Sequence, residues 1–330
     1  MKKIIRFGSF VLLLFTSLAS AYAAAAYDMG IVTGGKTGTY IQIGKNIQGL
    51  LYGHDINLDV HPSTGSMENI TSVLKRKGIQ LGIVQSDVLS YIEDSSDDQD
   101  MKRYLKKIKL IFPLYNEEVH ILARKPLKTL SDLQNKRVAL GRDGSGTFLT
   151  SSTILNLAEI RLSREYLVGG EAALEALKAN RIDAMFYVAG SPVKLFRDRV
   201  HSADELNLIE IDDKAVKELY SESRISRGTY AWQKQDLNTV SVKAMLITYD
   251  YQHANCKRVA DIAELIYKNK PLLENYGHTK WKDVDLNASL PKKWQRYSCV
   301  RDRLKLGTPL HPTCHKITNP ISRKICSSRQ

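Results

Sequence analysis

The sequence has few cysteines, few tryptophans and, beyond its N-terminal stretch, no long hydrophobic run. Its 330 residues include four cysteines and three tryptophans. No later segment approaches the roughly 20 apolar residues that a membrane-spanning helix requires, so no membrane span is expected in the mature chain. No cysteine directly follows the N-terminal apolar run, which argues against a lipoprotein anchor.

The N-terminus itself has the pattern of a secretory signal peptide. Three cations precede an apolar run over residues 7–19, and Ala21 and Ala23 supply the small residues of a cleavage site. We expect residues 1–23 to be removed after Ala23 and the mature chain to be exported. The periplasm is the expected location, with secretion beyond it as the alternative.

The net charge of +13 is concentrated near the C-terminus, where acidic residues are scarce. From Lys292 to Gln330 there are ten lysines and arginines against one acid, Asp302. A nucleic-acid-binding protein would place such charge in a folded groove with interleaved aromatic residues, and no such pattern is present. We expect a solvated basic tail over residues 311–330 that meets an anionic surface or a partner.

All four cysteines lie in the last third of the chain, at Cys256, Cys299, Cys314 and Cys326. In an oxidising compartment an even number favours two disulfides, and three pairings are open. The alternative is a zinc site in which His311 and His315 flank Cys314, although the spacing contains no C-x-x-C unit. We expect disulfides, with no metal and no cofactor.

Short apolar runs alternate with amphipathic segments, which is typical of an α/β protein with largely parallel strands. The pattern restarts near Glu117, and residues 237–250 form a predicted strand that returns to the first unit. The sequence therefore predicts a two-lobed binding-protein fold of the Venus-flytrap type. Lobe 1 comprises residues 24–118 and 242–310, lobe 2 comprises residues 119–241, and two crossing strands join them around a ligand cleft.

The stretch MGIVTGGKTGTY, residues 29–40, contains the P-loop spacing from Gly30 onward. In a true P-loop the strand ends at the first glycine, but Ile31 and Val32 are strand residues here. We therefore expect a strand that ends at Thr33, followed by a glycine-rich loop. The spacing does not indicate a nucleotide site.

The glycine-rich loop leads to a predicted helix that begins near Tyr40, with Thr37 or Thr39 as its cap. Free N–H groups at a helix start attract an anion, so the loop is a candidate site for a small anionic ligand. The alternative is that glycine and threonine serve only to cap the helix.

Four further strand-to-helix junctions repeat this arrangement, in PSTGS, QSD, GRDGSGT and AGSP. In the last of these, Pro192 is expected at the first helical position. Ligands of open α/β sheets bind at the carboxyl ends of the strands, so the five junctions are expected to meet at the cleft. The candidate ligand-binding residues are Gly34, Gly35, Thr37, Gly38, Thr39, Tyr40, Thr64, Gly65, Ser66, Gln85, Ser86, Asp87, Gly144, Ser145, Gly146, Thr147, Tyr187, Ala189, Gly190 and Ser191. For Tyr40 and Tyr187, packing in the core is the alternative to stacking on the ligand.

The sequence resembles the TAXI-type solute receptors of TRAP transporters. The matching segments are TGGKTGTYIQIG, PSTGSMENI, LGIVQSDV, LYNEEVHILAR, GSGT, DAMFYVAGSP and GTPLHP, in this order between residues 28 and 312. The resemblance implies a monomeric receptor that binds a small carboxylate, glutamate-like or dicarboxylic, and delivers it to a TRAP-type membrane permease. Departures are Ile41 in place of a second tyrosine, Lys36 in place of an uncharged residue, and the basic tail.

Two other functions fit parts of the sequence. An exported hydrolase would use Ser145 or Ser66 as nucleophile and His61 or His120 as base, but no G-x-S-x-G motif is present. A secreted or surface-exposed protein on the same fold would use its basic, cysteine-containing tail to bind a partner. We expect a receptor and not an enzyme.

Overall fold

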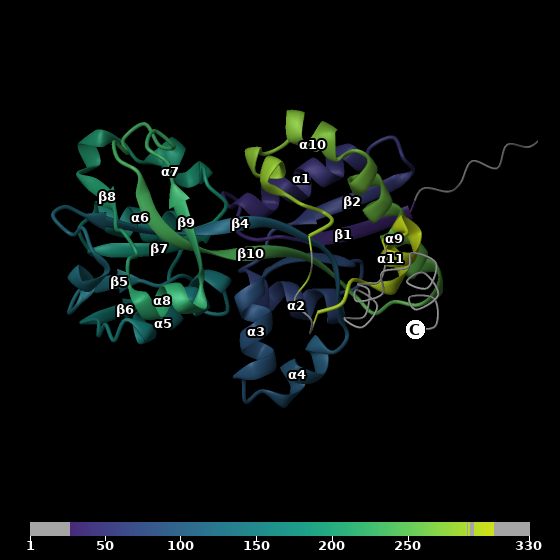
Figure 1. Cartoon of the computed structure of the whole chain (residues 1–330), viewed down its shortest axis with the longest axis horizontal. Coiled ribbons are helices and arrows are strands. Elements are labelled where there is room, and N and C mark those ends of the chain that lie inside the picture. The colour runs from purple at the N-terminus through teal and green to yellow at the C-terminus, as the bar shows by residue number, and fades with distance from the viewer. Residues whose placement is uncertain (1–26, 289, 291–293, 307–330) are drawn as a thin grey trace, which may run out of the picture.

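The computed structural model describes residues 27–288, 290 and 294–306. It is a two-lobed α/β structure in which two long strands pass from one lobe to the other (Figure 1). The predicted signal peptide, the basic tail, Cys314 and Cys326 lie outside the described residues. Within the described part of the chain, no helix is both long and apolar enough to cross a bilayer.

One mixed sheet runs through the molecule in the order β2-β1-β3-β10-β4-β7-β5-β6. The parallel strands of the first lobe are β1 (Tyr27–Val32), β2 (Ile56–His61) and β3 (Leu81–Gln85). The crossing strands are β4 (Ile108–Arg124) and β10 (Leu237–Tyr249), which pair antiparallel. The other strands of the sheet are β5 (Arg137–Ala139), β6 (Arg164–Tyr166), β7 (Ala184–Ala189), β8 (Leu206–Leu208) and β9 (Ser221–Ile225).

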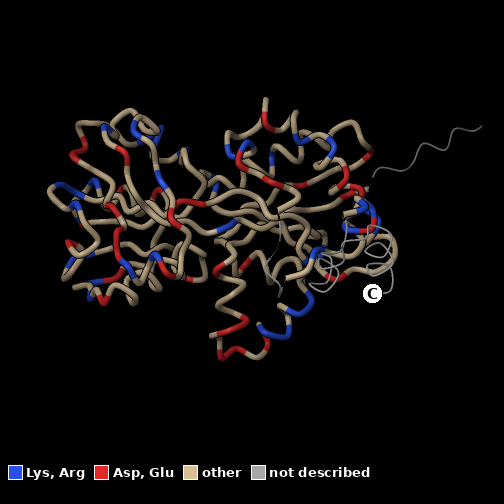
Figure 2. The backbone as a smooth tube through the Cα atoms, in the orientation of Figure 1, with Lys and Arg blue, Asp and Glu red and all other residues tan. Residues whose placement is uncertain are grey.

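Helices cover both faces of the sheet in each lobe (Figure 1). The first lobe has α1 (Thr39–Leu51), α2 (Ser66–Lys75), α3 (Ser86–Asp94), α4 (Gln99–Leu105), α9 (His253–Lys268), α10 (Lys270–Tyr276), η3 (Thr279–Asp283) and α11 (Ser298–Leu304). The second has η1 (Leu130–Leu133), α5 (Gly146–Leu157), α6 (Gly170–Lys178), α7 (Lys194–Arg199), η2 (Ser202–Asp204) and α8 (Lys214–Leu219). Basic and acidic residues are interspersed over both lobes (Figure 2).

The buried apolar side chains form separate clusters in the two lobes. The first-lobe clusters take residues from 29–115 and 244–300, whereas the second-lobe clusters take them from 119–242. Each lobe therefore has its own core, and the chain leaves the first lobe and later returns to it. The predicted fold class, two lobes joined by two crossing strands, is confirmed, while the residue boundaries of the lobes stay a prediction.

The strand break expected near Glu117 is absent, because residues 108–124 form one strand of 17 residues. The sequence suggests two strands here, since Pro113 and the polar Asn116–Glu118 interrupt the apolar run. Proline has no N–H group for the ladder. The register of β10 against β4 shifts between Lys243 and Met245, and Met245 lies opposite Pro113, so β4 continues past the proline into the second lobe.

The C-terminal helices of the first lobe are joined by a disulfide between Cys256 on α9 and Cys299 on α11. This is one of the pairs that the sequence left open. Both half-cystines also pack against the first-lobe core.

Replacing Cys256 and Cys299 together by serine is expected to lower the free energy of unfolding by about 2 to 4 kcal/mol. The disulfide closes a loop with a sequence separation of 43, and its removal gives the unfolded chain more conformational freedom. Urea unfolding measures the loss. A double variant as stable as the parent under oxidising conditions would contradict the expectation.

Candidate functional site

A cavity of about 590 Å³ lies between the lobes and is lined by both of them. From the first lobe it takes the loops after β1 and β2 and the end of β3; from the second it takes the loops before α5 and α6 and the end of β7. Strand-to-helix junctions thus meet across one space, as the sequence predicts. The lining residues are Gly34–Tyr40, Pro62–Ser66, Glu68, Gln85, Glu117, Gly141, Arg142, Ser145–Thr147, Gly169–Ala172 and Phe186–Ala189.

Most of the predicted ligand-binding residues line this cavity, and the exceptions are Ser86, Asp87, Gly144, Gly190 and Ser191. Ser86, Gly144 and Gly190 adjoin a lining residue in the chain, and Asp87 and Ser191 lie two positions from one. Each of them forms a hydrogen bond with another group of the protein. Their assignment as ligand-binding residues stays a prediction.

Several of these residues join the two lobes. Thr39 Oγ1 donates to the carbonyl oxygen of Gly190 over 2.9 Å. Met67 N–H donates to the carbonyl oxygen of Gly144 over 3.3 Å. The structure therefore holds the two lobes in contact beside the cavity, which is the closed arrangement of such a fold.

Asp87 forms a further contact between the lobes. Thr150 Oγ1 donates to Asp87 Oδ2 over 2.7 Å, and the Tyr220 hydroxyl lies 3.4 Å from the same oxygen. Burial raises the pKa of the Asp87 carboxyl to about 6. Asp87 acts here as an acceptor between lobes, which explains its position outside the cavity wall.

Helix starts from both lobes face the cavity with free N–H groups. The N-cap residues of α1, α2 and α6 are Gly38, Gly65 and Gly169, and no side chain among the described residues caps these helices. At α5 the Ser145 hydroxyl accepts from Phe148 N–H over 3.1 Å. Unfilled donors and aligned helix dipoles make such positions favourable for a negative group.

Two of the predictions about helix starts are wrong. Neither Thr37 nor Thr39 caps α1, because the N-cap is Gly38 and the Thr39 hydroxyl bonds to Gly190 instead. Pro192 is not the first residue of a helix, since α7 begins at Lys194 with Val193 as N-cap. At α1 the threonine hydroxyl is taken up by a contact with a distant segment, which local propensity does not register.

The structure adds site residues that the sequence did not single out. Gly169 is the N-cap of α6 and Gly170 is its first residue, and both line the cavity, as do Glu117, Arg142 and Glu68. The segment LVGGEAALEAL has the same strand, glycine and helix order as the predicted loops, so it carried a usable signal. The sequence around Glu117 carried no such signal, because Glu117 lies within a strand whose polar face is buried only by tertiary packing.

The inner wall of the cavity holds a buried acid. Glu117 is 2% exposed, and the Tyr40 hydroxyl donates to its Oε2 over 2.6 Å. Burial raises the pKa of the Glu117 carboxyl well above its usual range, and the Tyr40 hydrogen bond opposes this shift. Lys36 and Arg142, the cations of the lining, are exposed and stand at the rim.

The residues proposed for a hydrolase are not brought together. Ser66 and Ser145 line the cavity, but no histidine among the described residues does. His120 is fully buried, with Nε2 2.9 Å from the Tyr230 hydroxyl, and burial lowers its pKa to about 4. Neither of the proposed histidine bases therefore lines the cavity with Ser66 and Ser145.

Comparison with known proteins agrees with this geometry. The model of the NMT1-like family matches residues 31–293. The periplasmic binding protein BugD is similar with a TM-score of 0.54 at 9% identity, over 84% of this chain and 92% of that chain. A structure of Tv2483 bound to L-arginine is similar with a TM-score of 0.50 at 13% identity, over 80% of this chain and 95% of that chain. At these identities the two structures show the fold alone.

Proposed function

The chain belongs to the NMT1-like family, and we propose that it is an extracytoplasmic receptor that captures a small carboxylate by closing its lobes. The observation that carries the proposal is the set of helix starts without side-chain caps, contributed by both lobes to the wall of one cavity. Backbone N–H groups at these positions suit a carboxylate. A receptor needs no catalytic group, and the geometry supplies no nucleophile and base pair among the lining residues.

The expected interaction free energies are sufficient for the affinity of a receptor. A charge-assisted hydrogen bond contributes roughly 1.5 to 3 kcal/mol, and helix-terminus electrostatics add up to about 2 kcal/mol. Micromolar affinity requires about 8 kcal/mol after the costs of ordering are subtracted. Four or five hydrogen bonds from the two lobes reach this value. The ligand contacts both lobes only in the closed form, so binding shifts the equilibrium towards closure.

In the cell, we propose that the receptor works in the periplasm and delivers its ligand to a TRAP-type permease. The proposal extends the TAXI resemblance of the sequence and the export signal predicted at residues 1–23. The fold supports this proposal, because a two-lobed receptor that closes on its ligand is suited to delivering that ligand to a membrane partner.

Mass spectrometry of small molecules that copurify with the protein is expected to find a carboxylate. A thermal-shift panel of amino acids and dicarboxylates should then raise the midpoint of unfolding, since ligand at 100 times Kd adds about 2.7 kcal/mol. If none of the small carboxylates in the panel binds at millimolar concentration, the proposed function is contradicted.

Two cavity variants, Thr147→Ala and Gly38→Val, are expected to weaken binding without unfolding the protein. Thr147 lines the wall, and a Cβ at Gly38 would stand 3.3 Å from Gly35 O and 3.7 Å from the Tyr187 hydroxyl. Thr153→Ala, on the same helix but away from the cavity, is the matched control. Unchanged affinity in both cavity variants, measured by titration calorimetry, would place the ligand elsewhere.

A further inference from the structure

A second cavity, of about 540 Å³, lies within the first lobe and shares no lining residue with the cavity between the lobes. Helices α3 and α4, the first residues of β4 and the segment that leads into α11 bound it. Its volume is within the range of small-molecule sites. The proposed function gives this second cavity no role.

Cations outnumber acids on the wall of the second cavity. Its acids are Glu93 and Asp250, and its cations are Lys102, Arg103, Lys106, Lys109, Arg296 and Arg301. The cavity between the lobes has the opposite balance, with three acids and two cations. Cations that gather around a hollow in the surface attract anions and raise their local concentration. The second cavity therefore suits an anion that carries more than one charge.

The cations come from two segments that are far apart in the chain. Residues 102–109, on α4 and at the start of β4, supply four of them, whereas Arg296 and Arg301 belong to the basic C-terminal part of the sequence. The Tyr297 N–H group donates to the carbonyl oxygen of Leu110 over 2.7 Å, and the disulfide of Cys299 joins α11 to α9. The fold thus holds the C-terminal cations beside those of α4.

Half of the cations have no counter-ion of their own. Lys102, Lys106 and Arg296 form no ion pair with a carboxylate among the described residues, while the other three each pair with an aspartate. Like charges without counter-ions repel one another, so the empty cavity carries an electrostatic cost that a bound anion removes.

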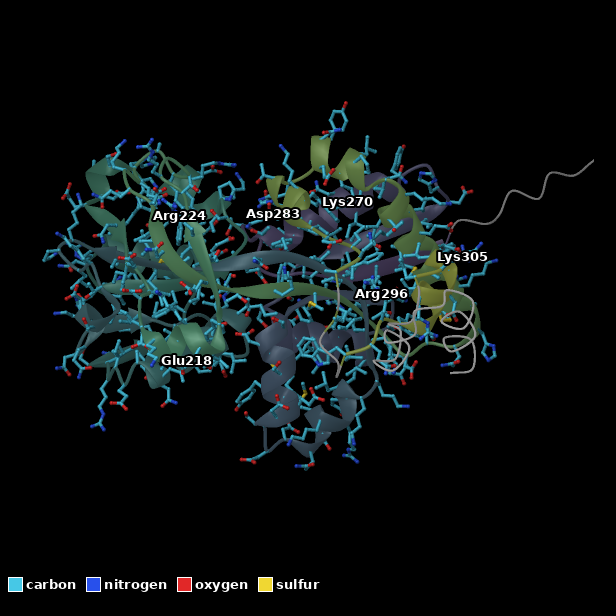
Figure 3. All side chains as sticks on the ribbon, viewed as in Figure 1. Glu218, Arg224, Lys270, Asp283, Arg296 and Lys305 are labelled. Atoms are coloured by element: carbon cyan, nitrogen blue, oxygen red, sulfur yellow. A yellow bond between two sulfur atoms is a disulfide. The ribbon has the colours of Figure 1, made fainter. Side chains whose placement is uncertain are left out.

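Arg296, labelled in Figure 3, is half-buried in the wall of the second cavity. Its Nη1 donates to the carbonyl oxygen of Ile111 over 3.1 Å, and its Cζ lies 5.3 Å from the centroid of the Phe112 ring. Burial lowers the pKa of the guanidinium, and Tyr267 and Asp285 oppose this shift. A guanidinium has five N–H donors, so the contact with Ile111 leaves donors for a ligand.

We propose that the second cavity binds a soluble phosphate monoester, whose phosphate group is held by Lys102, Lys106 and Arg296. Arginine and lysine are the side chains that bind phosphate in proteins, and a monoester carries about −1.5 to −2 charges near neutral pH. Leu89 and Leu105 also line the cavity and give the organic part of the ligand an apolar surface. The inference goes beyond the proposed function and does not depend on it.

Anionic lipid headgroups share this phosphate chemistry, but acids beside the second cavity disfavour a bilayer. Asp97, Asp98 and Asp100 are exposed on the loop and first turn that begin α4. An extended anionic surface that reached the cavity would come close to these acids and be repelled. A small ligand that enters the cavity meets less repulsion, because Asp100 is paired with Arg103.

Titration calorimetry of the purified protein with phenol, phenyl sulfate and phenyl phosphate tests the proposal. The three probes share a ring and differ in charge. Phenyl phosphate is expected to bind at least about tenfold more tightly than phenyl sulfate, and phenol more weakly than either. Equal affinity for the sulfate and the phosphate would overturn the assignment of a phosphate group. No detectable binding of phenyl phosphate at millimolar concentration would overturn the whole proposal.

The double variant Lys102→Gln, Lys106→Gln is expected to weaken phenyl phosphate binding at least about tenfold. Lys107→Gln is the matched control, because Lys107 is an exposed neighbour that does not line the second cavity. Arg142→Gln removes a cation of the cavity between the lobes and should leave phenyl phosphate binding unchanged. If Arg142→Gln abolishes this binding and the double variant does not, the phosphate binds between the lobes and the proposal is overturned.

Cosedimentation with vesicles separates the two sources of phosphate. Vesicles of phosphatidylglycerol and phosphatidylcholine are expected to leave the protein in the supernatant at physiological ionic strength. Sedimentation that is lost in the double variant, together with no binding of phenyl phosphate, would assign the second cavity to a lipid surface and overturn the soluble ligand. Failure of the carboxylate panel would contradict the proposed function and leave this proposal standing, since the two cavities share no residue.

Discussion

Lys280→Met is expected to lower the free energy of unfolding by about 3 to 5 kcal/mol at neutral pH. Lys280 Nζ lies 2.6 Å from Glu118 Oε1, and the two side chains are 8% and 6% exposed. Removal of the cation leaves an acid buried on the strand that crosses between the lobes. Asp283, labelled in Figure 3, also lies 3.1 Å from Lys280 Nζ, but its side chain is mostly exposed and stays solvated when the cation is removed. Urea unfolding measures the loss.

The loss is expected to depend on pH with a defined sign. Burial raises the pKa of the Glu118 carboxyl even with Lys280 present, and without Lys280 the pKa rises further. A folded state that holds a proton more tightly than the unfolded state gains stability as the pH falls. The difference between variant and parent should therefore shrink on mild acidification. Lys282→Met, at an exposed neighbouring lysine, should change stability by less than about 0.5 kcal/mol.

Gly146→Ala is expected to weaken ligand binding by roughly 5- to 150-fold, because crowding a packed contact costs about 1 to 3 kcal/mol. A Cβ at Gly146 in the second lobe would overlap the Gln85 side-chain amide of the first lobe and come within 3.0 Å of Ser66 Oγ. The methyl group thus opposes closure directly. When the lobes are apart, the methyl group at position 146 does not contact Gln85 or Ser66. The ligand-free protein should therefore keep its melting temperature.

Titration calorimetry measures the affinity, and small-angle X-ray scattering shows whether ligand still makes the molecule more compact. Gly49→Ala is the control, since a Cβ at Gly49 meets no atom within 4 Å in the described structure. It should bind as the parent does and gain about 0.5 to 1 kcal/mol of stability in α1. If Gly146→Ala binds and compacts like the parent, the lobes do not close over this contact.

The glycine-rich loops could be predicted from the sequence because their signal is local. The signal is an apolar strand that is followed by Gly, Ser or Thr and then by an amphipathic helix. In an open α/β sheet this order places the loop at the carboxyl edge, whichever position the strand takes in the sheet. The loops at 34–40, 64–66 and 145–147 were found in this way. Gly169 and Gly170 fit the same pattern and were missed because the loop is short and carries no hydroxyl residue.

The inner wall of the cavity could not be predicted from local sequence patterns. Glu117 is a polar residue inside a strand, and nothing in its neighbours along the chain indicates that Tyr40, 77 residues away, donates to it. The same holds for β4, whose continuity depends on the register shift in β10 opposite Pro113. These features arise from the pairing of distant segments, which composition and periodicity do not encode.

The position of β10 between β3 and β4 governs the order in which the chain can fold. Because strand β10 begins at Leu237, the first-lobe sheet keeps open edges on β3 and β4 until most of the polypeptide has emerged. The second-lobe clusters draw on one continuous stretch, and Val240 and Val242 of the same strand complete one of them. While the chain is being synthesised, therefore, β3 and β4 have unpaired edges that can pair with other strands, and a chain truncated before residue 237 would leave these edges unprotected.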